Sequence, residues 1–342
     1  MKSLFYTNST IGYGSGGGVV TYHIRQALRE LPSDVEWFDG KGEEGFFCEG
    51  LGKFDLAVFY GAPFGLVAEK VQPAKIVSDV APHNIELSRE EHHRLGLPFA
   101  YPHLNDYNLW REYMKHVILA DLVIVHSHFS GQYLRENLKL ENRVEVISHG
   151  CDLPEKIAQY PEEFTVGHLG VNGPDKGQIY LIRAWKLLQE KIRKRLYVPP
   201  TISFPNPQWF EFEQGSLILA GSGTEALGGL GYVKDAIEIY KQCTIYVQPT
   251  VTEGFGIPVF EAMANTRPVI VTDGAGSSEW IEDGKDGFVV PIRSPEALAD
   301  KIQYFHGNPS EVKRMGANAR KKAEKYTWDK IRKEYVRLFE SC

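Results

Sequence analysis

Two glutamates frame a glycine-rich loop and the start of a helix in the second half of the chain. The stretch TVTEGFGIPVFEA follows the apolar run TIYVQP, and it places Glu253 on the loop and Glu261 eight residues later. Pro258 fits the first turn of a helix, where an N–H has no partner to lose. Gly254 and Gly256 let the backbone present amides at the helix N-terminus, an arrangement that binds anions. The pattern predicts a binding site for an anionic ligand, with the Glu253 carboxylate at one end of the site and the Glu261 carboxylate at the other. Taken singly, Glu253 also fits a solvated loop residue, and Glu261 also fits a residue that complements the helix dipole.

A second glycine-rich loop lies near the N-terminus. Gly12, Gly14 and Gly17 fit G-x-G-x-x-G after the run SLFYT, and Asp39 follows 22 residues after Gly17. This is the pattern of dinucleotide-binding proteins. In that pattern the first glycine ends the strand, whereas residues 8–11 here lie between the run and Gly12. The loop predicts a phosphate site at a helix N-terminus, and an NAD-dependent dehydrogenase is the less favoured interpretation.

The elements that must position these loops alternate regularly. Strand-length apolar runs occur in both halves: SLFYT, VEWF, DLAVFY, KIVSDV, DLVIVH and VEVIS, then FTVGHLG, SLILAG, TIYVQP, PVIVT and GFVV. Helix-period segments between them predict parallel sheets covered by helices. The polar stretch 149–163 is interpreted as an interdomain linker. We therefore expect an α/β protein of two Rossmann-like, doubly wound domains facing each other across a cleft, with ligands at the carboxyl ends of the strands.

Composition narrows the class of protein. The 342 residues suit two domains, and a net charge of −6 argues against a nucleic-acid partner, which needs a basic face. The four cysteines are scattered, the N-terminus lacks the apolar core of a signal peptide, and no apolar stretch reaches the roughly 20 residues of a membrane span. We expect a cytoplasmic protein. The basic run at 191–195 is expected to be a solvated helix end, with peripheral membrane contact as the alternative.

Two segments break the alternation. Residues 83–115 carry four histidines among many aromatic and charged residues, and residues 193–214 are rich in proline and aromatics. Long irregular segments are often functional loops. A contact with substrate and a cover over a sheet edge are equally open for the first segment, and a cover is favoured for the second.

The second half closely resembles the donor site of GT-B glycosyltransferases, specifically glycosyltransferase family four. The resemblance rests on the E-x7-E pair, on EGFGIPVFEAM, on PVIVTDGAG with the Glu279 that follows it, and on DGKDGFVV at 283–290. Scattered matches cover most of the chain: the glycines at 16–18, ADLVIVHS, ISHGCD, DKG at 175–177, LILAGSG, LGYV and YTWDKIRKEYVRLFE.

This resemblance implies a GT-B fold and a retaining glycosyltransferase. The implied domains are an N-terminal acceptor-side domain over 1–155, a C-terminal donor domain over 156–325, and a last helix over 326–342 that crosses back to the first domain. The enzyme would move a sugar from a UDP-, GDP- or ADP-sugar to a hydroxyl of a glycan, a lipid or another acceptor. It would need neither a metal nor a cofactor beyond the donor.

The resemblance also assigns roles to matching positions. Glu261 is expected to hold the ribose hydroxyls, and Glu253 to lie beside the donor sugar. Lys176 is expected to bind the diphosphate, whose negative charge grows as the glycosidic bond breaks. Further donor contacts are expected from loop residues, mainly through their amides: Gly16, Gly17, His168, Ser222, Gly254, Phe255 and Gly256.

Three departures from the family matter. His168 stands where the family carries an arginine, and neutral histidine is a poorer phosphate clamp, so either His168 is protonated or Lys176 acts alone. Only residues 224–229 separate GSG from LGYV, where the family usually has a longer helical segment, so the second domain is expected to be shortened. The nucleotide base of the donor could therefore be recognised differently. Asp79 lies near the family's His-Asp pair beside the acceptor, with Ser78 in the histidine's place, and remains a catalytic candidate.

Other functions share much of this pattern. A non-hydrolysing nucleotide-sugar epimerase has the same two-domain architecture, because fold does not fix function. An epimerase would need no acceptor region, whereas residues 83–115 look like one. A non-catalytic sugar-nucleotide binder is the third interpretation, and the presence of Glu253, Glu261 and Lys176 together argues mildly against it. His126 and His149 are expected to be structural.

Overall fold

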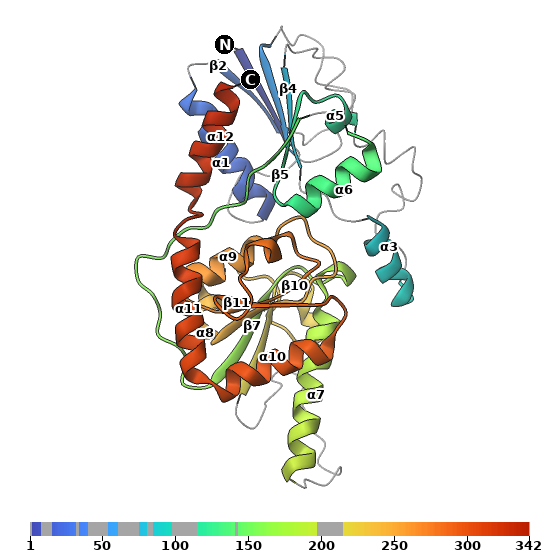
Figure 1. The fold of residues 1–342 in the computed structure, drawn as a ribbon, viewed down its shortest axis with the longest axis vertical. Helices are drawn as coiled ribbons and strands as arrows, with labels where there is room; N and C mark the ends of the chain where they lie inside the picture. The colour runs from blue at the N-terminus through green and yellow to red at the C-terminus, as the bar shows by residue number, and fades with distance from the viewer. Residues whose placement is uncertain are drawn as a thin grey trace. The chain divides into compact units, whose positions relative to one another are not determined.

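The computed structural model describes residues 2–7, 16–31, 34–39, 54–60, 75–80, 85–97, 115–140, 143–196 and 215–341. Contacts divide the chain into two compact units (Figure 1). Unit 1 comprises Met1–Ile85, Pro98–Gly150 and Trp328–Cys342, and unit 2 comprises Glu86–Leu97 and Cys151–Thr327. Both units are therefore assembled from segments that are separate in the sequence.

Unit 1 is built on a six-stranded parallel sheet in the order β2-β1-β3-β4-β5-β6. The strands are β1 (Lys2–Thr7), β2 (Asp34–Asp39), β3 (Leu56–Tyr60), β4 (Lys75–Asp79), β5 (Leu122–Val125) and β6 (Arg143–Val146). Every residue of β3 and β5 is buried, as expected of strands covered on both faces. The order changes direction at β1, whose carboxyl end leads to the glycine-rich loop.

The helices of unit 1 that the described residues form are α1 (Gly16–Glu30), α5 (Lys115–Ile118), α6 (His128–Leu138) and α12 (Trp328–Glu340). The last helix, α12, packs beside α1, and Figure 1 shows the two running together near the chain termini. Trp328 stacks on His23 with ring centroids 4.3 Å apart, and Arg332 bonds Glu30 at 2.8 Å. The segment after residue 327 therefore completes the N-terminal unit.

Unit 2 is built on a five-stranded parallel sheet in the order β11-β10-β9-β7-β8. The strands are β7 (Phe164–Leu169), β8 (Gly215–Ala220), β9 (Ile245–Gln248), β10 (Val269–Thr272) and β11 (Gly287–Val290). Its helices are α3 (Ile85–Arg94), α7 (Gln178–Leu196), α8 (Ile237–Gln242), α9 (Ile257–Ala264), α10 (Pro295–Gly307) and α11 (Pro309–Ala323). Short 3₁₀ helices are η2 (Pro174–Lys176), η3 (Thr224–Leu227) and η4 (Gly276–Trp280).

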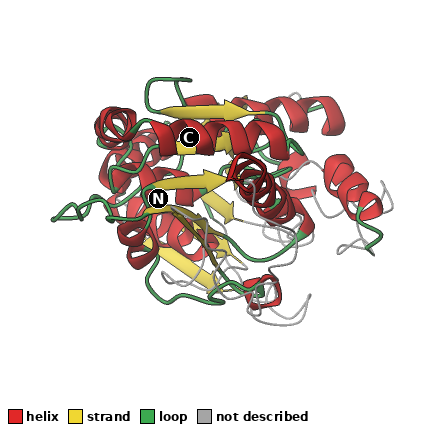
Figure 2. Cartoon of the chain, turned by 90° about the horizontal axis from the view of Figure 1, so that it is seen from below, coloured by secondary structure: helices red, strands yellow, loops and turns green. Residues whose placement is uncertain are grey.

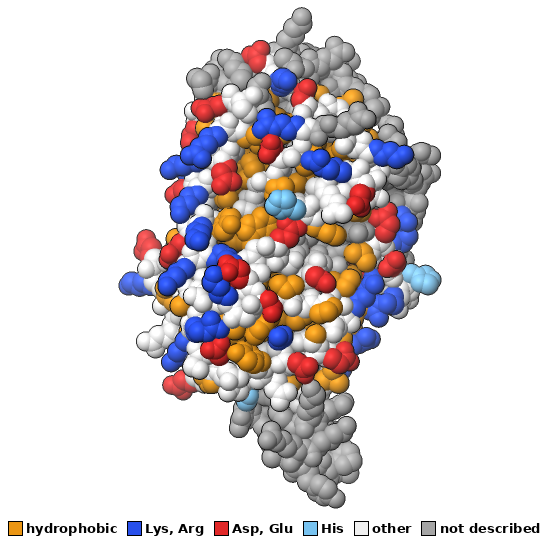
Figure 3. Space-filling view, viewed as in Figure 1, with side chains coloured by type: hydrophobic (Ala, Val, Ile, Leu, Met, Phe, Trp, Pro, Cys, Tyr) orange, Lys and Arg blue, Asp and Glu red, His pale blue; other side chains and the backbone are white. Residues whose placement is uncertain are grey.

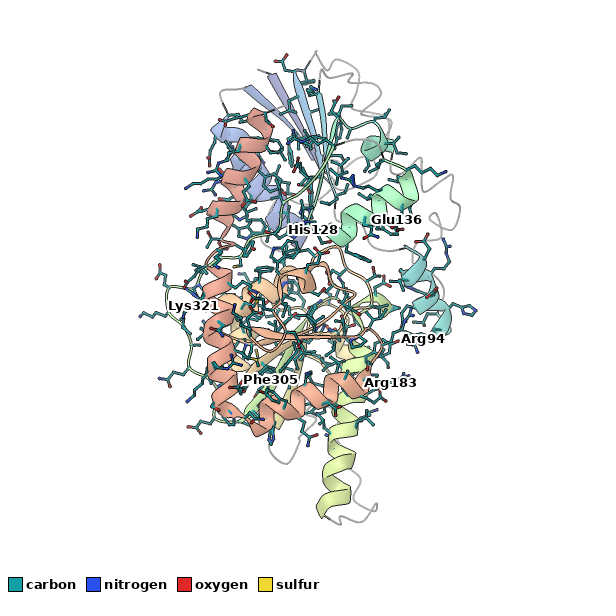
Figure 4. All side chains as sticks on the ribbon, viewed as in Figure 1. Arg94, His128, Glu136, Arg183, Phe305 and Lys321 are labelled. Carbon is teal, nitrogen blue, oxygen red and sulfur yellow. The ribbon has the colours of Figure 1, made fainter. Side chains whose placement is uncertain are left out.

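Helices pack around strands in the described part of the chain, which Figure 2 shows from a second direction. Helix α7 packs against α10, and α9 contacts both α8 and α11. The core includes Trp185 of α7 and Phe305 of α10, both of them buried, and Figure 4 labels Phe305. Two α/β domains with parallel sheets were predicted from the alternating runs, and the architecture confirms that prediction.

Helix α3 packs in unit 2, although the sequence prediction placed its residues within the first domain. Its Glu91 carboxylate is fully buried and accepts hydrogen bonds from Tyr180 Oη at 2.6 Å, from Arg293 Nε at 2.7 Å and from Arg94 Nη2 at 2.8 Å. Arg94, labelled in Figure 4, also lies 5.1 Å from the centre of the Tyr180 ring. A buried carboxylate with several charge-assisted bonds anchors α3. Part of the irregular segment 83–115 is thus helical, and residues 98–114 lie outside the described residues.

Charged side chains on the surface are mixed in sign. On the face in Figure 3, lysine and arginine side chains are interspersed with aspartate and glutamate. Along α11, for example, Arg314 pairs with Glu311 and Arg320 with Glu324. In the described part of the chain, no helix combines the length and apolar character that a membrane crossing needs.

The buried carboxylate of Glu91 generates a stability prediction. Glu91→Ala leaves Arg293 without its main partner and should cost about 3 kcal/mol, because removing one member of a buried ion pair strands the other. Urea unfolding, together with hydrogen exchange of the α3 amides, would measure the loss. Glu90→Ala is the matched control, since the Glu90 side chain is 66% exposed. The free energy of unfolding of this control variant should differ from that of the wild type by less than about 0.5 kcal/mol. Equal stability of both variants would contradict an anchoring role for Glu91.

Candidate functional site

The loops after β7 and β9 meet at the carboxyl edge of the unit 2 sheet. Gly177 has φ 67°, in the left-handed region that favours glycine, and a Cβ there would overlap the carbonyl oxygen of Pro249. The amide of Val251 donates to the carbonyl oxygen of Asp175 at 2.8 Å. These contacts set η2, which carries Lys176, directly against the loop that carries Glu253.

Lys176 and Glu253 form an ion pair at this edge. Lys176 Nζ lies 2.5 Å from Glu253 Oε1, and the two side chains are 22% and 18% exposed. The other carboxylate oxygen, Oε2, accepts from Gln248 Nε2 at 3.0 Å and from Thr250 Oγ1 at 3.2 Å. Each of these three neighbours is a donor, so the arrangement suits an ionised carboxylate that only accepts hydrogen bonds. The pair remains open enough to solvent for a ligand to reach it.

The loop between Glu253 and α9 is fixed by the segment that follows β10. The Glu253 amide donates to Gly274 O at 2.9 Å, and the amides of Gly276 and Ser277 donate back to the carbonyls of Glu253 and Phe255 at 3.0 Å and 2.8 Å. Gly256 has φ 100° and caps the N-terminus of α9, which Pro258 enters in its first turn. The backbone at 254–256 thus leads into a helix N-terminus, as the sequence predicted.

Phe255 itself contributes its side chain to the core. The ring is 2% exposed and stacks on Phe260 with centroids 5.2 Å apart. A donor contact by Phe255 would therefore involve its backbone, and that contact and those of Gly254 and Gly256 stay predictions.

Glu261 lies about one turn into α9. Its Oε2 accepts from Tyr240 Oη at 2.6 Å, and Arg267 Nε holds the Tyr240 carbonyl at 2.7 Å. Burial raises the pKa of Glu261, the Tyr240 hydrogen bond opposes this rise, and the nearby Asp152 carboxylate adds to it. In the described part of the chain no donor contacts the second oxygen, Oε1, of this half-buried carboxylate. Glu261 can therefore accept from a ligand hydroxyl.

His168 does not form a charged part of the site. Its ring is fully buried, and Nδ1 donates to Val247 O at 2.9 Å. Burial lowers its pKa to about 4, so the imidazole is neutral near pH 7. Nε2 faces Gly170, where a Cβ would lie 3.1 Å away. This placement favours the second of the two sequence-based alternatives, in which Lys176 acts without a cationic partner.

The loop after β8 supplies Ser222. Its side chain is exposed, and its carbonyl oxygen accepts from the Asn172 amide at 2.9 Å. Gly221, at φ 121°, packs so closely on the Gly170 carbonyl that a Cβ would overlap it. Ser222 therefore lies on the same sheet edge as Lys176, and its expected contact with the donor stays a prediction.

The remaining predicted residues belong to unit 1. Gly16 and Gly17 are the first two residues of α1, and residues 8–15 of the loop before them lie outside the described residues.

Asp79 is fully buried at the end of β4, where Tyr335 Oη donates to Oδ2 at 2.7 Å and His126 Nε2 lies 2.9 Å from Oδ1. His126 Nδ1 donates to Ile147 O at 2.9 Å, and the centres of the His126 and His149 rings lie 3.8 Å apart. Both carboxylate oxygens of Asp79 thus face protein groups, and the catalytic role expected of it stays a prediction.

Several site residues escaped sequence reasoning. Gln248 and Thr250 contact Glu253, and Tyr240 contacts Glu261. Ser88 of α3 donates to Asp175 Oδ2 at 2.9 Å, next to Lys176. A glutamine at the end of the otherwise apolar run TIYVQP was a signal, whereas nothing local linked Ser88 to a loop 87 residues away. Within the described residues, no cluster of three or more His, Cys, Asp or Glu side chains could hold a metal ion.

Comparison with solved structures defines the class of fold. Sucrose-phosphate synthase from Thermosynechococcus elongatus matches with a TM-score of 0.72 at 18% identity, over 100% of this chain and 99% of that one. Anabaena HepE, in a structure described as a complex with UDP and glucose, matches with a TM-score of 0.67 at 20% identity, over all of both chains. The protein has the GT-B fold.

The sequence comparison assigns the family. The model of the family "Glycosyl transferases group 1" matches residues 152–322, half of the chain. The chain belongs to this family. The capsular polysaccharide biosynthesis glycosyltransferase CapM of Staphylococcus aureus is 26% identical over 237 residues, which are 63% of this chain and 61% of CapM. The match thus spans less than two thirds of that relative's length.

The close approach at Gly177 generates a prediction about the site. Gly177→Ala should lower the free energy of unfolding by more than about 2 kcal/mol, because the new Cβ combines left-handed backbone strain with overlap on Pro249. Gly173→Ala is the matched control in the same loop, since its φ is −177° and no atom lies within 4 Å of a Cβ there. Urea unfolding should show the control within about 0.5 kcal/mol of the wild type. Equal effects of the two substitutions would exclude the close approach as a constraint.

Proposed function

We propose that this protein is a retaining, metal-independent glycosyltransferase of family four that transfers a sugar from a nucleoside diphosphate sugar to a hydroxyl of a glycan. The observation that carries the proposal is the Lys176–Glu253 pair beside the N-terminus of α9. One cation and one helix N-terminus lie at the carboxyl edge of a parallel sheet, where such folds bind ligands. The family and the E-x7-E spacing of Glu253 and Glu261 support the same reaction.

In this proposal the two charged groups act at opposite ends of one bond. The diphosphate forms an ion pair with the Lys176 ammonium group, which stabilises the negative charge that grows on the leaving group. Glu253 accepts hydrogen bonds from the donor sugar. The acceptor hydroxyl attacks the anomeric carbon on the face from which the diphosphate leaves, and a phosphate oxygen takes the hydroxyl proton. The configuration of the sugar is therefore retained.

The nucleoside end of the donor would lie at Glu261. Its second oxygen, Oε1, accepts from a ribose hydroxyl, while Tyr240 keeps the other oxygen in place. UDP is the first nucleotide to test, because a UDP complex is described for HepE, which shares the fold. A polysaccharide acceptor is supported by the role named for CapM.

The phosphate role of Lys176 has a direct test. Lys176→Ala should weaken the binding of UDP, GDP or ADP by about 10- to 100-fold and leave the affinity for the free nucleoside unchanged, since a hydrogen bond to a charged group contributes about 1.5–3 kcal/mol.

A thermal-shift panel of these diphosphates, their sugar conjugates and NAD, with and without magnesium, first identifies the ligand. A ligand at about 100 times its dissociation constant stabilises by about 2.7 kcal/mol. The exposed Lys186 of α7 gives the control Lys186→Ala.

Two results of that panel would overturn the assignment. A shift with NAD alone would indicate a dinucleotide enzyme. Equal losses of diphosphate and nucleoside affinity in Lys176→Ala would remove the lysine from the phosphate site.

Glu253 is expected to act on turnover more than on binding. Glu253→Gln keeps the shape of the side chain but removes its charge, so kcat for release of the nucleoside diphosphate from the sugar nucleotide should fall about 100-fold. The dissociation constant of the sugar nucleotide should rise by less, about 10-fold, the contribution of one hydrogen bond to the donor sugar. Glu296→Gln, at an exposed position in α10, is the control and should retain wild-type kinetics. Near-wild-type turnover of Glu253→Gln would show that this carboxylate does not serve the reaction.

A further inference from the structure

Gln248 is the last residue of β9, and its carboxamide is held from both ends. The side chain is buried, with 1% of its surface exposed. Its Nε2 donates to Thr250 Oγ1 at 2.9 Å and to Glu253 Oε2 at 3.0 Å, and its Oε1 accepts from Tyr246 Oη at 2.7 Å. All of these groups belong to unit 2. The amide therefore connects a buried tyrosine to the carboxylate of the candidate site.

The orientation of this amide follows from its partners. Tyr246 Oη carries one proton and has two acceptors within reach, Gln248 Oε1 at 2.7 Å and Leu169 O at 3.1 Å, and the Leu169 amide, 3.4 Å away, donates to it. The shorter contact is the one to Gln248 Oε1. When the Tyr246 proton goes to Gln248 Oε1, both Nε2 hydrogens remain for Thr250 and Glu253. The reversed amide would place its oxygen against the Glu253 carboxylate, where two acceptors would face each other. Buried polar groups favour the arrangement that satisfies all of them.

The consequence concerns Glu253 when a ligand arrives. In the structure, Lys176 holds Oε1, and Gln248 with Thr250 holds Oε2. A diphosphate that pairs with the Lys176 ammonium removes the restraint that Lys176 places on Oε1. The orientation of the carboxylate then depends more on the contacts of Oε2. Gln248 supplies one of these contacts from the core, beside Thr250, where no ligand competes for it.

We propose that Gln248 is a positioning residue for Glu253, and that it keeps Oε1 directed at the donor sugar after the diphosphate has engaged Lys176. This inference rests on the proposed function. It differs from a purely structural role, in which Gln248 would only satisfy the end of β9. A structural role affects all ligands alike, whereas a positioning role affects the ligand that carries a sugar.

The test compares a sugar nucleotide with its own diphosphate. The probes are UDP-glucose with UDP, GDP-mannose with GDP, and ADP-glucose with ADP, and calorimetry gives the dissociation constants. Gln248→Met fills the space but cannot donate, and it should reduce the preference for the sugar nucleotide over its diphosphate about 10-fold. Gln242→Met is the matched control, because Gln242 is exposed at the end of α8, where its amide donates to Glu238 O at 2.9 Å. The control should keep the wild-type ratio.

A second variant gives a signature that loss of packing cannot produce. Gln248→Glu places a carboxylate against Glu253 Oε2, and two carboxylates at that spacing ionise together only with difficulty. The variant should lose its preference for the sugar nucleotide at about pH 8. It should recover that preference as the pH falls towards about 5, because a proton held by the introduced carboxyl group and donated to Glu253 replaces the amide hydrogen.

The signature is the difference between the variant and the wild type at the same pH, because the terminal phosphate of the diphosphate probe itself changes charge at about pH 6. The titratable protein groups near the pair are Lys176 from η2, His168 from β7, Tyr246 on β9 itself and, beyond Tyr246, Glu261 of α9. Burial raises the pKa of Glu261, and its contact is expected with the ribose that both members of a probe pair carry, so its titration cancels in their ratio. Burial lowers the pKa of His168 to about 4 and raises the pKa of Tyr246 well above its ordinary value, so neither changes charge between about pH 5 and pH 8.

The outcomes separate this inference from the proposed function. If the wild type binds one of the three probe pairs and Gln248→Met keeps the wild-type ratio, the positioning role is overturned and the proposed function stands. The same holds if Gln248→Glu shows no recovery at low pH. If the wild type binds none of the diphosphates or sugar nucleotides, both are overturned together.

Discussion

The close approach of Gly177 to the carbonyl oxygen of Pro249 is the contact on which the candidate site depends. It is made possible by a backbone conformation that favours glycine, and the absence of a side chain lets two loops from neighbouring strands touch. Because η2 ends next to Gly177, the same contact fixes Lys176, and because Pro249 precedes the glutamate loop, it also fixes Glu253. The ion pair is thus a consequence of backbone geometry, and flexible side chains alone would not produce it.

The polar groups of the site are supported from the core. Arg267, fully buried, donates to the carbonyl of Tyr240 and lies 4.5 Å from the centre of the Tyr160 ring. The Tyr240 hydroxyl in turn bonds Glu261, so a buried guanidinium supports the backbone of the residue that contacts this carboxylate. Buried polar groups are costly unless they are paired, and here the pairing extends outward to the groups that face solvent.

Much of the fold was predictable because buried parallel strands have a distinct composition. Each of the eleven apolar runs coincides with a described strand, and central strands such as β3 and β5, which are covered on both faces, are apolar along their length. The loop and helix from Glu253 to Glu261 were predictable for a similar reason, because glycine and proline have specific positions at a helix start. Lys176 and Glu253 were assigned to one donor site through the family resemblance, and their ion pair joins the loops after the neighbouring strands β7 and β9.

Contacts between distant segments were not predictable in the same way. The neutral state of His168 depends on complete burial, which a single histidine after an apolar run does not reveal. The pairing of Asp79 with Tyr335 joins residues 256 positions apart, and no periodicity records it. Likewise, α3 resembles an ordinary charged helix in sequence, and only its contacts show that Glu91 is a core residue of unit 2.

The position of α3 has a consequence for dividing the chain. Unit 2 is discontinuous, because residues 86–97 belong to it while the segments on either side belong to unit 1. A fragment that begins at residue 151 contains the whole five-stranded sheet and the family match, yet it lacks the carboxylate that neutralises Arg293. It would also expose the Tyr180 ring. Insertion of residues 86–97 through a linker, or co-expression with that helix, is therefore the rational way to isolate this half of the molecule.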